Sequence, residues 1–470
     1  MELASMRLQN RIYLVGNRAV RSSMAVMTSH PVLSSFLIAL GVRVVVAIST
    51  GLAHKGTLIG DEGQYLILAL MASEGKLSSG FWSGYGQSLF DTTRTFTWPL
   101  TALFWLFGPS RIVAQLFVAT FGAVTSACAA CLASRFLRKE FALGAGLVVA
   151  FFPSQILWST VVLRESLIWA GLAAIAVTVD YSQRSESDLR TALLTVLLGL
   201  LFVATVGLRE HSALLALWCL CPALLVGRSR LRVRILTASC LLILAPWMVG
   251  LGPGGSDYAW KAMESMGSSR AYMAQGADSS ISEEIYDCPA LLESQMEHGG
   301  GSDEVGAAIS RLIDRERGEW ICIHDQSGIG RFVDNRLTTS FRRLPGGLYD
   351  TMIRPLPWGG GRGVALSLAG LESLLWIPLY GLAAYGLWAH GKGHRVLVYP
   401  TLLLFSLSIS GAVTHGNLGT AFRHRGQICF VLAVLAMAGV QAIVEGRRMK
   451  SRERSLGIVS DHEYADSDER

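Results

Sequence analysis

The chain has 470 residues, and 51% of them are hydrophobic while only 16% are charged. A mean hydropathy of +0.41 exceeds what one soluble core could bury, so the composition excludes an ordinary soluble globular protein. The net charge of +6 falls mostly in short basic loops and tails; this is typical of membrane orientation signals, and no basic-aromatic pattern indicates a nucleic-acid partner.

Apolar runs of about 17 to 25 residues recur along the chain, which is the length that a helix needs to cross roughly 30 Å of hydrocarbon. Lipid cannot satisfy backbone polar groups, and this also favours helices. We therefore predict an all-α polytopic membrane protein with about ten transmembrane helices. The expected spans cover residues 32–53, 110–134, 141–158, 160–180, 191–208, 211–227, 233–251, 364–388, 396–414 and 427–445.

Residues 1–31 are basic, with no short apolar core followed by a small-residue cleavage site. They are interpreted as a cytoplasmic tail before a retained first span. Further basic clusters lie at Arg135–Lys139, Arg228–Arg234, His390–Arg395 and Arg447–Arg454. With about ten spans these clusters share the cytoplasmic side, and so do both termini. A multi-pass protein of the cell membrane is expected, and the lack of Asn-x-Ser/Thr sequons in the far-side loops is compatible with a bacterial inner membrane.

The spans divide the chain into two transmembrane parts. The predicted segments are a transmembrane core at 32–251 with a first extracytoplasmic loop at 54–109, a large extracytoplasmic loop at 252–363, a second transmembrane part at 364–445 and a cytoplasmic tail at 446–470. Two apolar stretches in the first loop, Gln64–Ala72 and Thr97–Phe107, are too short to span and are predicted to be interfacial helices. In the large loop, Ala307–Arg317 is predicted to be a short amphipathic helix.

The eight cysteines form no metal-binding framework. Cys128 and Cys131 lie inside an apolar helix with no second pair, and are interpreted as small buried residues. Cys288 and Cys322 both fall in the large loop, where an oxidising compartment would permit a disulfide, although two cysteines fix no distance.

Two adjacent carboxylates, Asp61 and Glu62, follow the first span in the stretch Gly60–Tyr65. Charge beside an apolar surface is costly unless it binds something, and such a carboxylate could accept a proton or hold a cation. The alternative is a solvated loop with ordinary charges. Arg164 and Glu165 lie inside an otherwise apolar span, where ionisable groups are costly and commonly functional. The alternative is that they form a structural salt bridge.

A basic cluster precedes the last span, against the usual bias of far-side loops. Its side chains are His415, Arg423, His424 and Arg425, and Arg209 and His211 in another far-side turn extend the same surface. Guanidinium groups hold phosphate oxygens by paired hydrogen bonds, so an anionic lipid headgroup is the expected ligand. Carboxylates beside such a site suit sugar transfer from a polyprenyl phosphate, since the carboxylate can deprotonate an acceptor hydroxyl while the arginines stabilise the departing phosphate.

The sequence resembles the GT-C class of membrane glycosyltransferases, in particular glycosyltransferase family 39, which includes protein O-mannosyltransferases and the aminoarabinose transferase of lipid A. The residues that carry the resemblance are Asp61-Glu62 with Tyr65, Phe152-Pro153-Ser154 leading to Glu165, and Arg423-His424-Arg425. The resemblance implies that Asp61 is the catalytic base and that Glu62 assists it or binds a cation. It also implies a polyprenyl-phosphate-linked sugar as donor, with a glycan, lipid or protein as acceptor.

The complete set of candidate site residues combines both lines of reasoning. The catalytic candidates are Asp61, Glu62 and Glu165, and the substrate-binding candidates are Tyr65, Arg164, Arg209, His211, His415, Arg423, His424 and Arg425. The three carboxylates could also supply oxygen ligands to Mg²⁺ or Mn²⁺, but their spacing defines no metal site.

Two other functions remain open. A polysaccharide polymerase or ligase also handles lipid-linked glycans, but would depend on far-side arginine and histidine rather than on paired carboxylates. A transporter or an assembly partner is the third hypothesis, and a transporter should show broken helices and charges near the mid-plane of the membrane. Arg43, inside the first span, is most simply a snorkelling or inter-helix residue.

Overall fold

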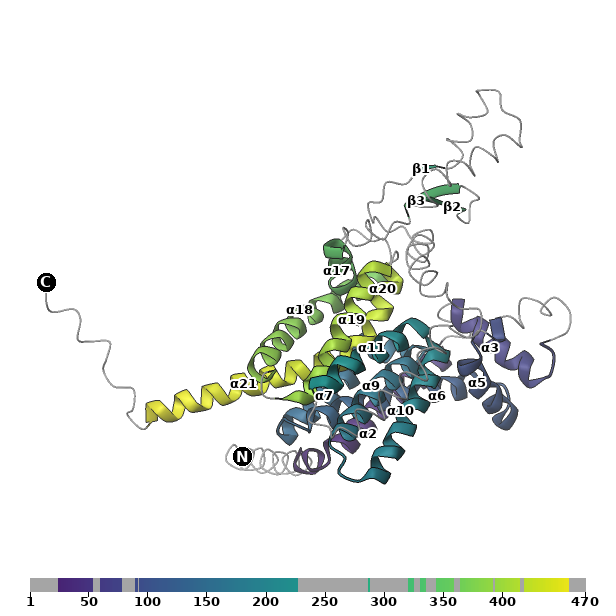
Figure 1. Cartoon of the computed structure of the whole chain (residues 1–470). Coiled ribbons are helices and arrows are strands. Elements are labelled where there is room, and N and C mark those ends of the chain that lie inside the picture. Colours follow the sequence, from purple (N-terminus) through teal and green to yellow (C-terminus); the bar gives the residue numbers. More distant parts are fainter. Residues whose placement is uncertain are drawn as a thin grey trace, which may run out of the picture.

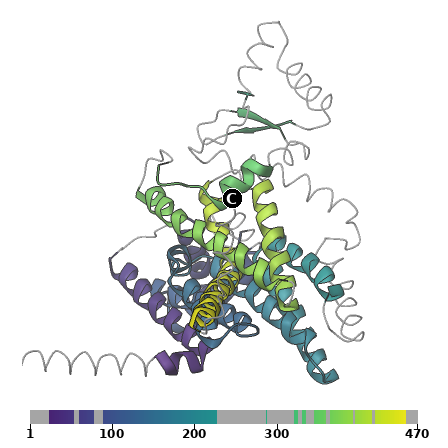
Figure 2. The same cartoon turned by 90° about the vertical axis from the view of Figure 1, so that its left-hand side faces the viewer.

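The computed structural model of the protein describes residues 24–53, 60–77, 89–91, 93–226, 286–287, 320–324, 330–334, 344–358, 364–391, 394–414 and 418–455. Helices dominate this part of the chain and pack into a bundle (Figures 1 and 2). Five described helical stretches are long and apolar enough to cross a membrane: Pro31–Leu52, Arg111–Ala133, Asp188–Leu208, Arg395–Val413 and Gly419–Met449.

The helices are distributed over both halves of the chain. In the first half they are α2 (Pro31–Ala53), α3 (Gly60–Ser73), α5 (Arg94–Phe107), α6 (Arg111–Ala133), α7 (Lys139–Phe151), α8 (Pro153–Trp158), α9 (Glu165–Gln183), α10 (Asp188–Leu208) and α11 (Glu210–Val226). In the second half they are α17 (Leu344–Met352), α18 (Val364–His390), η2 (Arg395–Leu397), α19 (Val398–Thr414), α20 (Leu418–Arg425), η3 (Gly426–Ile428) and α21 (Cys429–Ser455).

Three short strands lie within the predicted large loop. They are β1 (Tyr286–Asp287), β2 (Trp320–His324) and β3 (Gly330–Asp334), and they form an antiparallel sheet in the order β1-β3-β2. In Figure 1 this sheet lies beyond the end of the bundle that carries α17 and α20. The loop therefore contributes some β structure to a protein that was expected to be all-α.

Most of the predicted spans correspond to helices. Residues 32–53 and 110–134 match α2 and α6, 191–208 and 211–227 match α10 and α11, 364–388 and 396–414 match α18 and η2–α19, and 427–445 lies in η3–α21. The predicted span 233–251, the predicted helix Ala307–Arg317 and Cys288 lie outside the described residues. Cys128 and Cys131 are free thiols on α6, half-buried rather than fully buried.

The predicted spans 141–158 and 160–180 are not continuous helices. α7 ends at Phe151, and only the six-residue α8 lies between it and α9. The break occurs at Pro153, which has no backbone N–H and whose ring disfavours a continuing helix. The segment between α7 and α9 nevertheless runs through the interior of the bundle, where its polar side chains are buried: Ser154, Gln155, Ser159 and Thr160.

Arg43, near the middle of α2, donates hydrogen bonds to backbone carbonyls at the end of α7. Its guanidinium donates to the carbonyls of Val149 and Ala150, both at 3.3 Å, and to the hydroxyl of Ser159 at 2.7 Å. The last carbonyls of a helix lack intrahelical partners and carry partial negative charge, so a cation is favourable there. Arg43 is fully buried, and its interpretation as an inter-helix residue is confirmed.

Replacing Arg43 with methionine should lower the free energy of unfolding by about 2–4 kcal/mol, because buried carbonyls lose their donor. Thermal unfolding in detergent, followed by circular dichroism, measures this change. Arg138→Met is the matched control, since the Arg138 side chain is 46% exposed and its pair with Glu140 is 3.5 Å long; a loss of about 0.5 kcal/mol or less is expected. Equal stability of the two variants would contradict the role assigned to Arg43.

Glycines allow close helix contacts near the end of the chain. A Cβ at Gly386 of α18 would meet the backbone of Leu435 in α21, and a Cβ at Gly439 of α21 would meet the backbone of Leu382 in α18. Small residues at such contacts favour helix association in lipid, where apolar side chains gain little by leaving the bilayer. Gly426 of η3 similarly lies against the ring of Trp169 on α9. The first two contacts join α18 to α21, and the third places η3 beside the start of α9.

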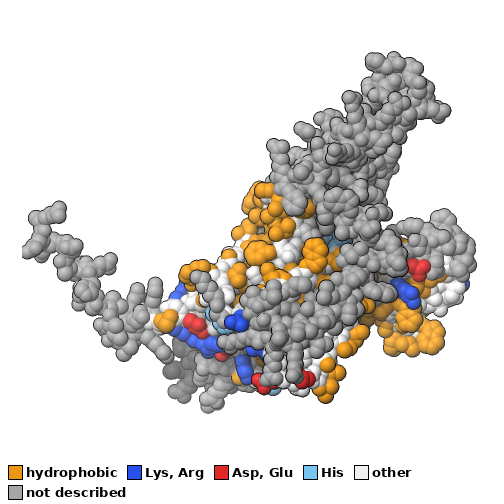
Figure 3. Space-filling model, viewed as in Figure 1, with side chains coloured by type: hydrophobic (Ala, Val, Ile, Leu, Met, Phe, Trp, Pro, Cys, Tyr) orange, Lys and Arg blue, Asp and Glu red, His pale blue; other side chains and the backbone are white. Residues whose placement is uncertain are grey.

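The surface of the bundle is divided by side-chain type. Hydrophobic side chains cover much of the face seen in Figure 3, and most of the visible charged side chains gather at its lower edge. Helix α5 presents a further apolar surface, with 14 residues and a length of about 21 Å. Its exposed large side chains are Trp98, Trp105, Leu106 and Phe107.

Candidate functional site

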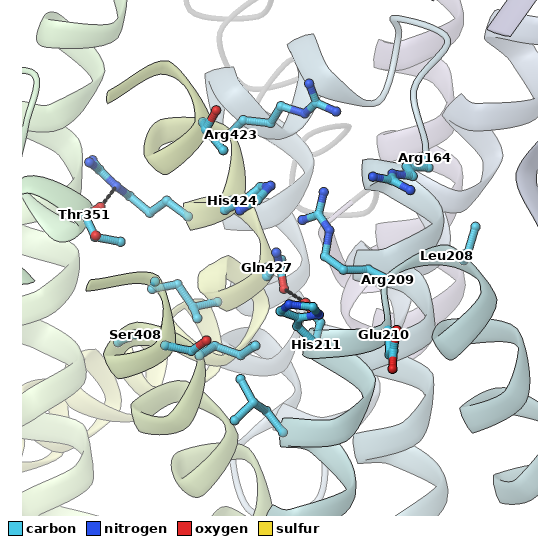
Figure 4. A pocket seen from close by; sticks show the side chains of 18 of the residues that line it. Arg164, Leu208, Arg209, Glu210, His211, Thr351, Ser408, Arg423, His424 and Gln427 are labelled. Carbon is cyan, nitrogen blue, oxygen red and sulfur yellow. Dashed lines mark hydrogen bonds between the residues drawn. The ribbon is translucent and has the colours of Figure 1, made fainter. Parts of the chain in front are cut away.

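A cavity of about 580 Å³ opens among the ends of several helices. Figure 4 shows Arg209 and His211, from the junction of α10 and α11, opposite Arg423 and His424 of α20. Arg164, just before α9, and Arg425, the last residue of α20, also line the cavity. Four arginines and two histidines predicted as substrate-binding residues therefore share one cavity; His415 lies outside the described residues.

Glu165 joins two of these arginines. It is the first residue of α9 and its side chain is fully buried. Oε1 accepts a hydrogen bond from Arg209 Nη2 at 2.9 Å and lies 2.7 Å from Arg423 Nη2. The start of a helix is also a favourable place for a carboxylate, because the helix dipole is positive there. Glu165 thus holds two guanidinium groups in the wall of the cavity.

Asp61 reaches the same arginine from α3. Arg423 Nη1 donates to Asp61 Oδ2 at 3.0 Å, while its Nη2 lies against Glu165. The Asp61 side chain is 52% exposed and that of Arg423 is 17% exposed. Arg423 therefore connects an accessible carboxylate with a buried one, and it brings together two catalytic candidates that are far apart in the sequence.

Glu62 does not join this group. Its buried carboxylate accepts hydrogen bonds from Arg111 Nε at 3.0 Å and from Arg111 Nη2 at 3.2 Å. Arg111 is the first residue of α6 and is not among the residues that line the cavity. A paired contact of this kind fixes both side chains in orientation. The ion pair fastens α3 to α6 and thereby holds Asp61 beside Arg423.

Tyr65 lies one helical turn after Asp61 and is largely buried. Its ring packs edge-on against Phe96 of α5, with the ring centroids 4.9 Å apart. Burial raises the pKa of Tyr65; nearby Glu165 and Asp61 also raise it, whereas Arg164 and Arg423 lower it. The phenol is within electrostatic reach of these charged groups but is not among the residues that line the cavity. Its role in substrate binding stays a prediction.

Arg425 holds the opposite wall. Its Nε donates to the carbonyl of Thr351 at 2.7 Å and its Nη2 donates to the carbonyl of Arg354. The guanidinium carbon lies 5.5 Å from the ring centre of Trp376, within the range of a cation–π interaction. The side chain is almost fully buried, so Arg425 both lines the cavity and anchors the residues that follow α17.

Several guanidinium nitrogens at the cavity have no hydrogen-bond acceptor among the described residues. They are Arg164 Nε, Arg209 Nη1, Arg423 Nε and Arg425 Nη1, and each is buried. Burial lowers the pKa of Arg209 to about 10, against the opposing effect of Glu165. Buried polar groups are normally paired, and guanidinium groups are well suited to a phosphate. An anion in this cavity could therefore accept hydrogen bonds that the surrounding side chains do not.

The three carboxylates suggested as metal ligands are separated by their arginine partners. Glu62 is held by Arg111, and Asp61 and Glu165 are held by Arg423. Within the described ranges, no three His, Cys, Asp or Glu side chains form a group that could hold a metal ion. Binding of Mg²⁺ or Mn²⁺ by these three carboxylates stays a prediction.

Some residues of the site were not anticipated from the sequence. Arg111 and Gln427 lie at the starts of the predicted spans 110–134 and 427–445 and were not among the candidate residues. In the structure, Gln427 Oε1 accepts a hydrogen bond from Ser212 at 2.8 Å and both residues line the cavity. Only the rarity of polar residues within spans could have indicated Gln427.

Comparisons with known proteins do not assign the chain to a family. No protein-family model matches the sequence, and no match is found among the curated proteins. The resemblance to membrane glycosyltransferases thus rests on the residues quoted above.

Proposed function

We propose that this protein is a glycosyltransferase that uses a sugar linked to a polyprenyl phosphate and acts on the extracytoplasmic face of the membrane. The main support is the cavity in which four arginines meet, Arg164, Arg209, Arg423 and Arg425, each of which has a buried nitrogen with no acceptor among the described residues. A phosphate group would supply those acceptors. The acceptor of the sugar would be a glycan, a lipid or a protein.

The proposed reaction is an inverting transfer. Asp61 takes the proton from an acceptor hydroxyl, whose oxygen forms a bond to the anomeric carbon of the sugar. The bond between that carbon and the phosphate oxygen breaks, and the polyprenyl phosphate leaves with the electron pair. The arginines stabilise the negative charge that develops on the leaving phosphate. Asp61 suits this role because its side chain is half-exposed beside Arg423.

Glu62 and Glu165 receive positioning roles in this proposal. Both side chains are fully buried and paired with arginine, so neither can meet an acceptor hydroxyl without losing a partner in the protein interior. A buried charge that loses its partner is strongly unfavourable. The arrangement therefore favours Asp61 as the base among the three carboxylates first considered.

The proposed topology has about ten transmembrane helices, with both termini in the cytoplasm of a bacterial cell. Its support is that segments predicted to face the far side lie together: the residue before α9, the α10–α11 junction and α20 line one cavity, and α3 contacts Arg423 of that cavity through Asp61. The short helices α3 and α5 would lie at the interface, because 14 residues reach only about 21 Å. The exposed aromatic residues of α5 suit that position.

Binding of a polyprenyl phosphate to the purified protein in detergent tests the site. Arg423→Ala is expected to weaken binding by about 30-fold or more, since it removes a buried charged partner. Arg423→Lys keeps the positive charge but lacks the planar guanidinium group, so its affinity should lie between those of the wild type and Arg423→Ala. Arg138→Ala is the control, because Arg138 pairs with Glu140 on an exposed surface. No binding by the wild type, or equal binding by Arg423→Ala, would contradict the proposal.

A polysaccharide polymerase or ligase is the second candidate. It is favoured by the number of arginines and histidines in the cavity wall and by the pairing of Glu62 and Glu165 with arginine. Such an enzyme would need Arg423 but not Asp61. Loss of activity in Arg423→Ala with retention in Asp61→Asn would favour this candidate over the first.

A further inference from the structure

Arg423 binds two carboxylates that differ greatly in burial. We infer that the phosphate of the donor and Asp61 compete for Arg423, so that donor binding releases Asp61 for the acceptor hydroxyl. This inference rests on the proposed function and adds an order of events to it: the donor binds first, and only then does the base become available. Glu165 stays in place and holds the arginine throughout.

The competition follows from the positions of the charges. Arg423 contacts Asp61 at 3.0 Å and Glu165 at 2.7 Å, so its single positive charge already faces two negative charges. A phosphate bound to the same guanidinium would add further negative charge within a few ångströms of both carboxylates. Like charges at this separation repel strongly in a partly buried site. A phosphate that binds the Nη atoms of Arg423, which the two carboxylates occupy, therefore displaces one of them.

Asp61 is the carboxylate that can leave. Its side chain is 52% exposed, so it can exchange the arginine for water. Glu165 has no exposed surface and is held in addition by Arg209 at 2.9 Å. An ion pair at an exposed position contributes little stability, whereas a buried charge without its partner is strongly unfavourable. The phosphate thus replaces Asp61 rather than Glu165.

The release of Asp61 has a chemical consequence. While Asp61 Oδ2 accepts a hydrogen bond from Arg423, that oxygen is engaged by a cation. After the phosphate takes its place, the oxygen can accept the hydrogen bond of an acceptor hydroxyl. In the resting protein the base is thus paired with the very group that later binds the leaving phosphate. This pairing would delay engagement of the acceptor until a donor is present.

The affinity for a polyprenyl phosphate that carries no sugar tests the competition. Asp61→Asn removes the competing charge and is expected to tighten binding by about two- to fivefold, the range for a half-exposed ion pair. Glu74→Gln is the matched control, because Glu74 is a partly exposed carboxylate at the other end of α3 and pairs with Lys76 at 2.7 Å. It should leave the affinity unchanged. Unchanged or weaker binding by Asp61→Asn overturns the inference.

The Arg423 variant separates this inference from the proposed function. If Arg423→Ala abolishes binding and Asp61→Asn leaves it unchanged, the phosphate site stands and the competition is wrong. If Arg423→Ala binds as well as the wild type, the proposed function itself fails. Thermal unfolding of the Asp61→Asn protein should match that of the wild type, because the side chain is half-exposed; the affinity change then reports on charge and not on folding.

Discussion

Asp61→Asn is expected to lower the rate of sugar transfer by about 100-fold or more, the contribution typical of a general base. Asparagine has a similar shape but cannot take the proton of the acceptor hydroxyl. The variant should insert into the membrane and unfold at the same temperature as the wild type, since its side chain is 52% exposed. Transfer from a polyprenyl-phosphate-linked sugar, measured with purified protein in detergent, gives the rate.

The control for this variant must remove a similar charge at a distance from the cavity. Glu74→Gln, in the turn that follows α3, serves, because the carboxylate is 44% exposed and paired with Lys76. Full activity in Asp61→Asn would remove Asp61 from the role of base. Combined with tighter polyprenyl-phosphate binding, a loss of transfer in Asp61→Asn would also indicate that the defect lies in the chemical step and not in donor binding.

Glu165→Ala is expected to destabilise the protein by about 3–5 kcal/mol, since it leaves Arg209 and Arg423 in the interior without their shared carboxylate. Both arginines contact the same oxygen, at 2.9 and 2.7 Å, and the carboxylate has no exposed surface. The change in free energy should appear as a lower midpoint in denaturant or thermal unfolding of the detergent-solubilised protein.

An exposed ion pair provides the comparison for Glu165. Glu140→Ala removes a carboxylate that is 56% exposed and 3.5 Å from Arg138, and it should change stability by about 0.5 kcal/mol or less. The double variant Glu165→Ala with Arg209→Leu should recover part of the loss, because one unpaired charge is removed as well. If Glu165→Ala were as stable as Glu140→Ala, Glu165 could not be the anchor of the two arginines.

The sequence predicted the helical segments well where apolar runs were long and uninterrupted. Residues 32–53 and 110–134 match helices to within a residue, because hydrophobic length alone determines such a helix. The prediction was less accurate between residues 141 and 180, where α7 ends at Phe151, before Pro153, and the next long helix starts only at Glu165. A hydropathy pattern does not register this break, because the residues around it are also apolar or buried.

The candidate residues were chosen by type and by their place near the ends of spans, and four of them, Asp61, Glu165, Arg209 and Arg423, lie together in the structure. Charged residues in apolar surroundings are costly, so their presence is informative without coordinates. Which of these charges face one another could not be inferred, because contacts between distant segments leave no mark in local sequence. The pairing of Glu62 with Arg111 and of Arg43 with the end of α7 appeared only in the structure.

By itself, the sequence determined that this is a helical protein with membrane-spanning segments, because lipid as a solvent requires long apolar runs with internally satisfied backbones. Only the tertiary structure decided which charged side chains form ion pairs and how far each one is buried. It brought Asp61 and Glu165 to the two sides of Arg423, left the first half-exposed and buried the second. Burial and ion pairing depend on how the helices pack, and two carboxylates that look alike in sequence therefore lie in different environments.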